Sequence, residues 1–245
     1  MTDNGLKSCG ISPAMLSLDT VAQAIVQKNL CRPKVYNCLK QITNLQNKKI
    51  LDWGCGSGYF IYDSGGEIDI KKYTGVDVDL RCVKRLKGTW KDATAIHYNK
   101  YNQQYNSQGE QNPEWCLQET DKFDVIFSYS IFTHTSFEEF EYVFNRHKKH
   151  LDKNGIIVHT FVDLYNVTDT QYMIPTDKLP KYLKGEYFPT NELYRYDNTV
   201  KKEYEEIISE RFDAMFSRHY VKEKLNCEIN EYDMLLCSAI YKRED

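Results

Sequence analysis

A cluster of glycines between an apolar run and an aromatic segment constrains this chain more than any other feature. The stretch ILDWGCGSGYF carries glycines at positions 54, 56 and 58, directly after the apolar run Ile50–Trp53. Glycine adopts backbone conformations that other residues avoid, and it lets a ligand approach the main chain with no Cβ in the way. The pattern predicts a first strand that turns into a helix through a ligand-binding loop.

Strand and helix patterns alternate along the chain on both sides of this loop. The strand candidates are Ile50–Trp53, the segment YTGVDVD ending at Asp77–Asp79, Ala93–Tyr98, Phe123–Ser130 and Gly155–Val162. Helices are predicted at Leu18–Leu45 (split by Pro33), from Leu80 to Gly88, and at Thr199–Phe212. Such alternation is typical of a parallel sheet covered by helices, with a ligand cleft at the carboxyl ends of the strands.

The segment after Phe123–Ser130 has the clearest helix signals. Thr135 and Ser136 lie three residues before Glu138 and Glu139, which is the pattern of a capping box. Asn154–Gly155 is expected to end this helix. Its core stripe comprises Phe137, Phe140, Val143, Phe144, His147 and Leu151. Farther along, Ala214–Val221 and Met234–Tyr241 are predicted to be strands that pair antiparallel across the loop around Asn226–Asn230.

Composition excludes several classes of protein. The chain has 245 residues and a formal net charge of −3, so it supplies no broad cationic field for binding DNA. No apolar stretch reaches about 18 residues, and the first residues do not resemble a secretion signal. Its 8 cysteines form no CxxC pair, which favours free thiols over a metal site or a disulfide framework. We therefore expect a cytoplasmic protein of one domain with no metal.

A carboxylate at the end of the second strand candidate points to a nucleoside ligand. Asp77 lies where an acidic residue can accept hydrogen bonds from a ribose diol, whereas Asp79 is better explained as the N-cap of the next helix. A dinucleotide site of the G-x-G-x-x-G type would need glycine at position 59. That position is Tyr59, and the third glycine comes one residue early, so NAD or FAD is disfavoured.

Four segments in a fixed order resemble the class I S-adenosylmethionine-dependent methyltransferases: ILDWGCGSGYF, YTGVDVD, FDVIFSYSIFTH and KNGIIVHTF. The resemblance covers about Lys49 to Val162. It implies an α/β, Rossmann-like fold with a seven-stranded, mostly parallel sheet, helices on both faces and an antiparallel last strand. It also implies S-adenosylmethionine as the cofactor and an activity of class EC 2.1.1.-. One domain, 1–245, would comprise an N-terminal helical cover (1–47), a cofactor-binding core (48–162), an acceptor lid or insertion (163–198), and a terminal helix and β-hairpin (199–245).

The resemblance assigns the cofactor contacts residue by residue. Asp52 would face the ammonium group of the cofactor, directly or through water. The backbone of the loop would wrap the methionine and ribose parts, through Gly54, Cys55, Gly56 and Gly58. Asp77 would hold the ribose hydroxyls, with Val78 against the adenine.

Two further strands contribute to the implied site. The third strand lacks the acidic residue of the family's usual GDA-like stretch. In its place KDATAIHYNKYN offers Asp92 or Asn99, of which Asn99 is better placed to meet the adenine amino group. The methyl-transfer cleft would be bordered by the end of the fourth strand, at Ser128, Tyr129 and Ser130.

A catalytic base is optional, because the cofactor already carries a good leaving group. His134, just after the fourth strand, is the best candidate, although it could instead pack beside the Thr135 turn. His159 at a buried strand end could also reach the pocket, whereas His147 and His150 are expected at the surface or the core edge. His97 has no evident partner.

The acceptor is not specified by the sequence. No Asn/Asp-Pro-Pro-Tyr/Phe stretch, Pro-Cys pair or recognisable RNA-binding module occurs, so DNA is not expected and a small molecule is favoured. A protein or RNA methyltransferase remains the alternative, as does a non-catalytic binding protein that keeps the fold. The aromatic stretch 163–198 is either an acceptor lid or a cover over the sheet edge. Nothing specifies the oligomeric state.

Overall fold

The computed structural model describes residues 35–102, 105–132, 135–162, 218–231 and 236–243. The predicted acceptor lid at 163–198, the charged helix at Thr199–Phe212 and the candidate base His134 lie outside the described residues, as does the greater part of the helical stretch Leu18–Leu45. None of the described helices is long and apolar enough to cross a membrane.

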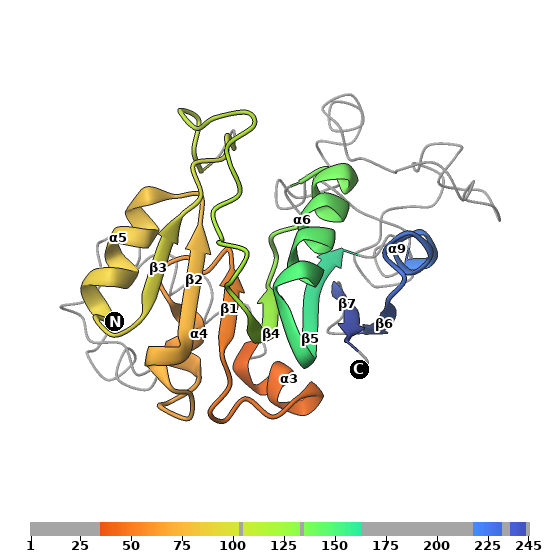
Figure 1. The fold of residues 1–245 in the computed structure, drawn as a ribbon, viewed down its shortest axis with the longest axis horizontal. Helices are drawn as coiled ribbons and strands as arrows, with labels where there is room; N and C mark the ends of the chain where they lie inside the picture. The colour runs from red at the N-terminus through yellow and green to blue at the C-terminus, as the bar shows by residue number, and fades with distance from the viewer. Residues whose placement is uncertain (1–34, 103–104, 133–134, 163–217, 232–235, 244–245) are drawn as a thin grey trace, which may run out of the picture. The chain divides into compact units, whose positions relative to one another are not determined.

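Seven strands form one sheet in the order β3-β2-β1-β4-β5-β7-β6 (Figure 1). The described residues fall into two compact units, within 1–116 and 117–245. In the first unit, parallel pairs join β2 to its neighbours; the strands are β1 (Ile50–Trp53), β2 (Tyr73–Asp77) and β3 (Thr94–His97). The first three predicted strands are confirmed.

In the second unit, one strand runs against the others. β4 (Phe123–Ser128) pairs in parallel with β5 (Leu151–Val162). β7 (Leu236–Lys242) pairs antiparallel with β5 on one side and with β6 (Glu228–Glu231) on the other. The α/β, Rossmann-like sheet, mostly parallel with a reversed last strand, is therefore confirmed.

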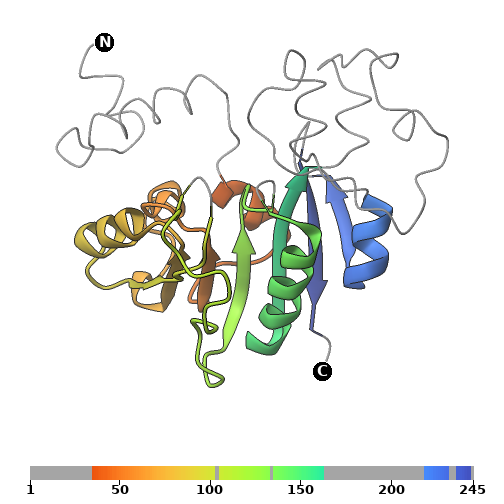
Figure 2. The same ribbon diagram turned by 90° about the horizontal axis from the view of Figure 1, so that it is seen from above.

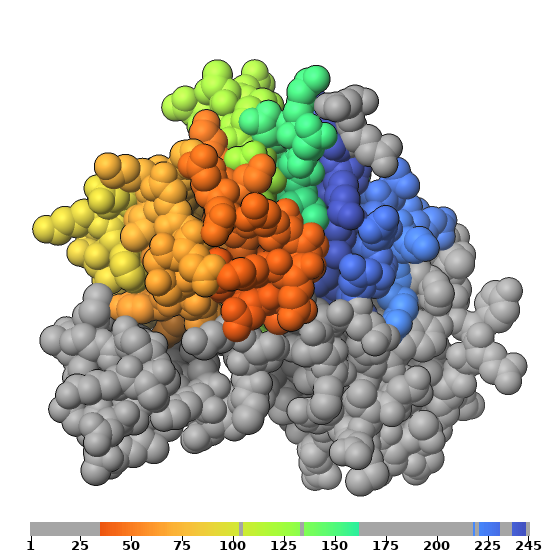
Figure 3. All heavy atoms as spheres, turned by 90° about the horizontal axis from the view of Figure 1, so that it is seen from below, coloured from red at the N-terminus to blue at the C-terminus, as the bar shows by residue number. Residues whose placement is uncertain are grey.

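Three helices and a 3-10 turn belong to the described part of the first unit. They are α3 (Val35–Ile42), α4 (Tyr59–Asp63), a 3-10 turn at Ile70–Lys72 and α5 (Leu80–Thr89). The rings of Phe60 on α4 and Tyr73 stack with centroids 6.3 Å apart, and Tyr36 of α3 packs on Phe60 at 5.8 Å. Figure 3 shows the α3 and α4 segments side by side in orange on one surface.

Helices of the second unit are α6 (Phe137–His150) and α9 (Arg218–Leu225). Figure 2 shows α6 lying along β5, and α9 beside β6 and β7. Ser136 is the N-cap of α6, because its hydroxyl accepts a hydrogen bond from the Glu139 amide at 3.2 Å. In the first unit Asp79 caps α5 in the same way, through the Arg81 amide at 2.8 Å. Both predicted capping sites are confirmed.

The predicted end of α6 is wrong. The helix stops at His150, and Asn154–Gly155 lies inside β5, which already begins at Leu151. Gly155 is needed there for packing, since a Cβ would lie 2.8 Å from the Leu151 side chain. Asn154, with φ of 56°, supplies the turn-like conformation that made the pair resemble a helix stop.

The predicted strand Ala214–Val221 is also wrong where the structure describes it. Residues 218–225 form helix α9, in which Val221 and Leu225 are buried one helical turn apart. The antiparallel partner of β7 is instead β6 at Glu228–Glu231, inside the stretch predicted as a loop. Charged and polar residues at this outer edge of the sheet concealed the strand.

Candidate functional site

The glycine loop after β1 adopts the left-handed backbone conformation at all three glycines. The φ angles are 81° at Gly54, 53° at Gly56 and 87° at Gly58. The amides of Gly54 and Cys55 both donate to the carbonyl oxygen of Val76, at 2.7 and 3.0 Å, which ties the loop to β2. The predicted strand-to-helix turn is therefore present, with helix α4 beginning at Tyr59.

Two of these glycines are required for different reasons. A Cβ on Gly58 would lie 3.1 Å from the indole of Trp90, so this position is closed by packing. A Cβ on Gly56 would meet only the Tyr59 ring, at 4.0 Å, among the described residues. Gly56 thus leaves an open cradle over its main chain, which is what a ligand in contact with the backbone needs.

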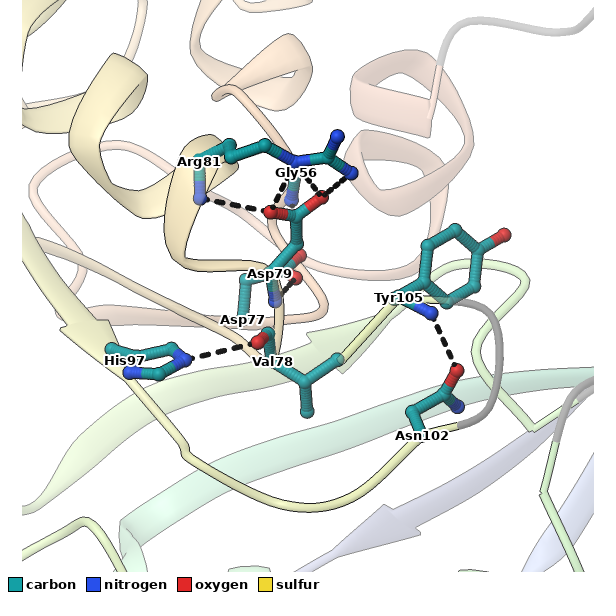
Figure 4. Close-up of polar contacts among 8 residues, drawn as sticks. All are labelled: Gly56, Asp77, Val78, Asp79, Arg81, His97, Asn102 and Tyr105. Atoms are coloured by element: carbon teal, nitrogen blue, oxygen red, sulfur yellow. Dashed lines mark hydrogen bonds and ion pairs between the residues drawn. The ribbon is translucent and has the colours of Figure 1, made fainter. Parts of the chain in front are cut away.

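Asp77 connects this cradle to the turn that follows β2 (Figure 4). Its Oδ2 accepts from the Gly56 amide and its Oδ1 from the Asp79 amide, both at 2.8 Å. Burial raises the pKa of Asp77, and the hydrogen bonds from the amides oppose that shift. A backbone hydrogen bond involving Val78 also lowers the pKa of Asp77. Since a carboxylate has about four lone-pair sites, Asp77 retains acceptor capacity for a ligand hydroxyl.

Val78 is held in place by a contact that sequence reasoning missed. The Nε2 atom of His97, on β3, lies 3.0 Å from the Val78 carbonyl oxygen, and the Tyr98 amide donates to the Asp77 carbonyl at 3.0 Å. Figure 4 shows His97 reaching back to the main chain of Val78. The carbonyl can only accept, so Nε2 carries the proton. The half-buried Val78 side chain lies just past the end of β2, as predicted.

Asp52 is buried beneath the glycine loop and bonded to a tyrosine. Its Oδ2 accepts from the Tyr73 hydroxyl at 2.6 Å, and the Asp52 side chain is 4% exposed. Burial raises the pKa of Asp52 to about 7, the Tyr73 hydrogen bond opposes the rise, and the nearby Asp77 adds to it. Asp52 is therefore a carboxyl group poised to change its protonation state near neutral pH.

Cys55 lies in the loop, but its thiol points into the core. A Cβ on Gly75 would be 2.8 Å from Cys55 Sγ, and burial raises the pKa of this thiol well above its usual range. A neutral, packed thiol is not a nucleophile. What Cys55 offers to a ligand is its main chain, in keeping with the prediction.

The third strand leads into a polar loop that uses Asn99 internally. Asn99 Nδ2 donates to Glu110 Oε1 at 3.0 Å, and Asn99 Oδ1 accepts from Asn106 at 3.2 Å. Asp92, the other residue considered for the adenine, is exposed ahead of β3. An aromatic cluster that was not predicted from the sequence anchors this loop: Trp53 stacks on Trp115 with ring centroids 5.0 Å apart, and packs at a tilt against Tyr98 at 5.3 Å.

In the second unit, the residues predicted at the end of β4 are tied to β5. The Ser128 hydroxyl lies 3.0 Å from Nδ1 of His159, and the Ser130 amide donates to Thr160 Oγ1 at 2.8 Å. Tyr129 between them is half-buried.

Three buried histidines lie on α6 and β5: His147 and His150 on the helix, and His159 on the strand. The sequence predicts His147 and His150 at the surface or the core edge. His147 and His159 are fully buried, with His147 Nδ1 and His159 Nε2 2.9 Å apart, and His150 is 3% exposed. Burial lowers the pKa of His159 to about 3 and that of His147 well below its usual range. The place of His147 in the core stripe of the helix is confirmed, whereas its expected position at the surface or the core edge is wrong. Its contact with His159 was not predicted, because the two residues lie on different elements.

Comparison with known proteins supports the same assignment. Residues 51–157 match a family model described as a methyltransferase domain. Among solved structures, the PH0226 protein from Pyrococcus horikoshii OT3 is 14% identical with a TM-score of 0.54, over 97% of this chain and 99% of that one. An S-adenosylmethionine dependent methyltransferase from Mesorhizobium loti is 12% identical with a TM-score of 0.53, over 86% of this chain and 98% of that one.

No curated protein matches the chain. The two solved structures share its fold, and the family model covers the glycine loop, Asp77, β4 and the first part of β5. Residues 51–157 therefore match a methyltransferase domain on this fold, which supports the resemblance to the class I S-adenosylmethionine-dependent methyltransferases and S-adenosylmethionine as the cofactor.

Proposed function

We propose that this chain transfers the methyl group of S-adenosylmethionine to a small-molecule acceptor. The observation that carries the proposal is the Asp77 carboxylate, held by the Gly56 amide beside an open stretch of glycine backbone. A diol-binding acid next to a backbone cradle suits the ribose and methionine parts of this cofactor. When bound, the cofactor supplies an activated methyl group on a sulfonium.

The chain's own residues would bind and orient that cofactor. Asp52 would face the ammonium group, Asp77 the ribose hydroxyls and Val78 the adenine. The backbone would contribute through Gly54, Cys55, Gly56 and Gly58. Asn99 is proposed for the adenine amino group, because its Oδ1 accepts one hydrogen bond from Asn106 and has a second lone pair that can accept from an amino group.

We propose the residues that surround the transferred methyl group from the resemblance to the methyltransferase family. Ser128 and Tyr129 would border the transferred methyl group, and His134 would remove the acceptor's proton. Because proximity and orientation alone can accelerate a displacement greatly, the base is an addition to the site and not a requirement. We also propose that the chain is one domain in which residues 163–198 form the acceptor lid. A cytoplasmic location is proposed because the cysteines form no CxxC pair, which favours free thiols. A protein or RNA acceptor would be a different outcome of an acceptor screen.

Replacing Asp77 tests the proposed ribose contact. We expect Asp77→Asn to weaken S-adenosylhomocysteine binding about 10- to 100-fold, because hydrogen bonds to a charged group contribute about 1.5–3 kcal/mol. Asp79→Asn is the matched control: it removes the same charge two residues away, and Asn is an equally good N-cap. Calorimetric titration of both variants would measure the difference. Equal affinities in the two variants would remove Asp77 from the site.

Asp52 predicts proton release on cofactor binding. With its pKa near 7, Asp52 is about half protonated at neutral pH, and a cationic ammonium nearby would favour the carboxylate. Binding at pH 7 should therefore release about half a proton, measurable as a dependence of the binding enthalpy on the ionisation enthalpy of the buffer. The release should disappear in Asp52→Asn. Binding with no proton release in the wild type would place the ammonium away from Asp52.

A further inference from the structure

Two consecutive residues of β5 hold the turn at the end of β4 from both faces of the strand pair. His159 Nδ1 is 3.0 Å from the Ser128 hydroxyl, and Thr160 Oγ1 accepts from the Ser130 amide at 2.8 Å. Successive side chains of a strand point to opposite faces, so the two contacts lie on opposite sides. We refer to Ser128, Ser130, His159 and Thr160 as the β4–β5 latch.

The Thr160 contact stabilises a backbone conformation that serine avoids. Ser130 has φ of 57°, in the left-handed region that favours glycine. Its amide is paired with a threonine hydroxyl that is 2% exposed, and the same hydroxyl is 3.4 Å from the Ser128 carbonyl oxygen. The turn thus keeps a disfavoured conformation because a buried side chain of β5 satisfies its main chain.

The His159 contact is fixed in turn by α6. His159 Nε2 lies 2.9 Å from His147 Nδ1, and three rings pack edge-on around His159, with centroids at 5.1 Å for Phe132, 6.4 Å for Phe140 and 5.8 Å for Phe144. The imidazole therefore cannot turn away from Ser128 without displacing packed side chains.

Charge does not disturb this arrangement at neutral pH. Burial depresses the pKa of both His147 and His159, so both rings are neutral. His159 on β5 and His150 on α6 also lower the pKa of His147. One neutral ring can donate a hydrogen bond to the other, and the Ser128 hydroxyl can bond to the remaining nitrogen of His159, Nδ1.

We propose that His159 and Thr160 are positioning residues, which hold the Ser128–Ser130 turn in the conformation that the cofactor site requires. This inference rests on the proposed function, because Ser128 and Tyr129 belong to the turn. It assigns to two β5 side chains, neither of which need touch a ligand, a role in setting the affinity of the site.

Paired variants of Thr160 test the inference, with a neighbour as control. Thr160→Val keeps the side-chain shape and removes the hydroxyl, whereas Thr160→Ser keeps the hydroxyl. Ser238 faces Thr160 across β5 and β7 and is buried, and within the described part of the chain its hydroxyl has no hydrogen-bond partner. Ser238→Ala therefore removes a hydroxyl from the same neighbourhood without touching the latch.

We expect amide hydrogen exchange at Ser130 to become about tenfold faster in Thr160→Val, the effect of losing one hydrogen bond, and to stay near the wild-type rate in Thr160→Ser and Ser238→Ala. Affinity for S-adenosylhomocysteine should fall about tenfold in the same single variant. Unchanged Ser130 exchange, or faster exchange with unchanged affinity, would overturn the inference.

Variants of His159 test the inference independently, and they remain informative if Thr160→Val folds poorly. His159→Asn can keep a polar atom near the Nδ1 position, whereas His159→Leu cannot, so only the asparagine variant should retain wild-type affinity. Equal affinities in the two variants would also contradict the inference. If the wild-type chain bound no S-adenosylhomocysteine, the proposed function would fail, and Ser130 exchange would still show whether Thr160 holds the turn.

Discussion

Gly56→Val should abolish cofactor binding in a chain that still folds. The cradle above Gly56 meets no described side chain nearer than Tyr59 at 4.0 Å, so the new side chain would occupy the space proposed for the ligand. We expect the affinity for S-adenosylhomocysteine to fall by more than about 1000-fold, which corresponds to about 4 kcal/mol.

Gly65→Val is the matched control for the backbone strain of this substitution. Gly65 has φ of 59° against 53° at Gly56, and among the described residues its Cβ would meet nothing within 4 Å, whereas that of Gly56 meets only Tyr59 at 4.0 Å. Both variants therefore place a branched side chain in the left-handed region with room around it. Gly65→Val should lose stability and keep its affinity. Comparable affinity in both variants would show that the glycine loop does not contact the cofactor.

The second large expected effect is a loss of folding stability at acidic pH. His147 and His159 have folded-state pKa values below that of an unfolded histidine, so the unfolded chain binds more protons and stability is lost as pH falls below about 6.5. Between pH 7 and pH 5 each histidine should cost about 2 kcal/mol in the free energy of unfolding, and the pair about 4 kcal/mol. His150, whose pKa burial also lowers, acts in the same direction.

Asp52 opposes this loss of stability at low pH, so a variant of Asp52 is a control whose effect has the opposite sign. Its pKa is raised in the folded state, so its contribution to stability grows as pH falls from about 7 towards the unfolded value, by about 2 kcal/mol at pH 5. Denaturant unfolding at both pH values should show a smaller acid loss in His147→Gln and a larger one in Asp52→Asn, each changed by about 2 kcal/mol. An identical acid loss in wild type and His147→Gln would refute the buried, neutral histidine pair.

Local signals in the sequence predicted the elements that build the cofactor side of the site. The glycine spacing placed the turn after Ile50–Trp53, and the apolar run before Asp77 placed β2. The N-caps at Asp79 and Ser136 were equally local, because a cap bonds to an amide two or three residues away. Each of these features depends on residues close together in the chain.

Features that depend on distant residues were missed. His147 and His159 belong to a helix and a strand that meet only in the folded unit, so neither sequence neighbourhood reveals their contact. The boundary between α6 and β5 was misplaced because Asn154–Gly155 has the composition of a helix stop, while the packing of Gly155 against Leu151 is tertiary. The edge strand Glu228–Glu231 was taken for a loop because its residues are charged or polar at three of four positions.

Calorimetric titration of the purified chain with S-adenosylmethionine, S-adenosylhomocysteine and NAD in parallel tests the central claim most directly. We expect saturable binding of the first two ligands at one site and no heat from NAD. Binding of NAD alone would contradict this expectation, because the glycine loop and Asp77 would then serve a dinucleotide. Absence of binding by all three would contradict the proposed activity and leave a protein that keeps the fold without its cofactor.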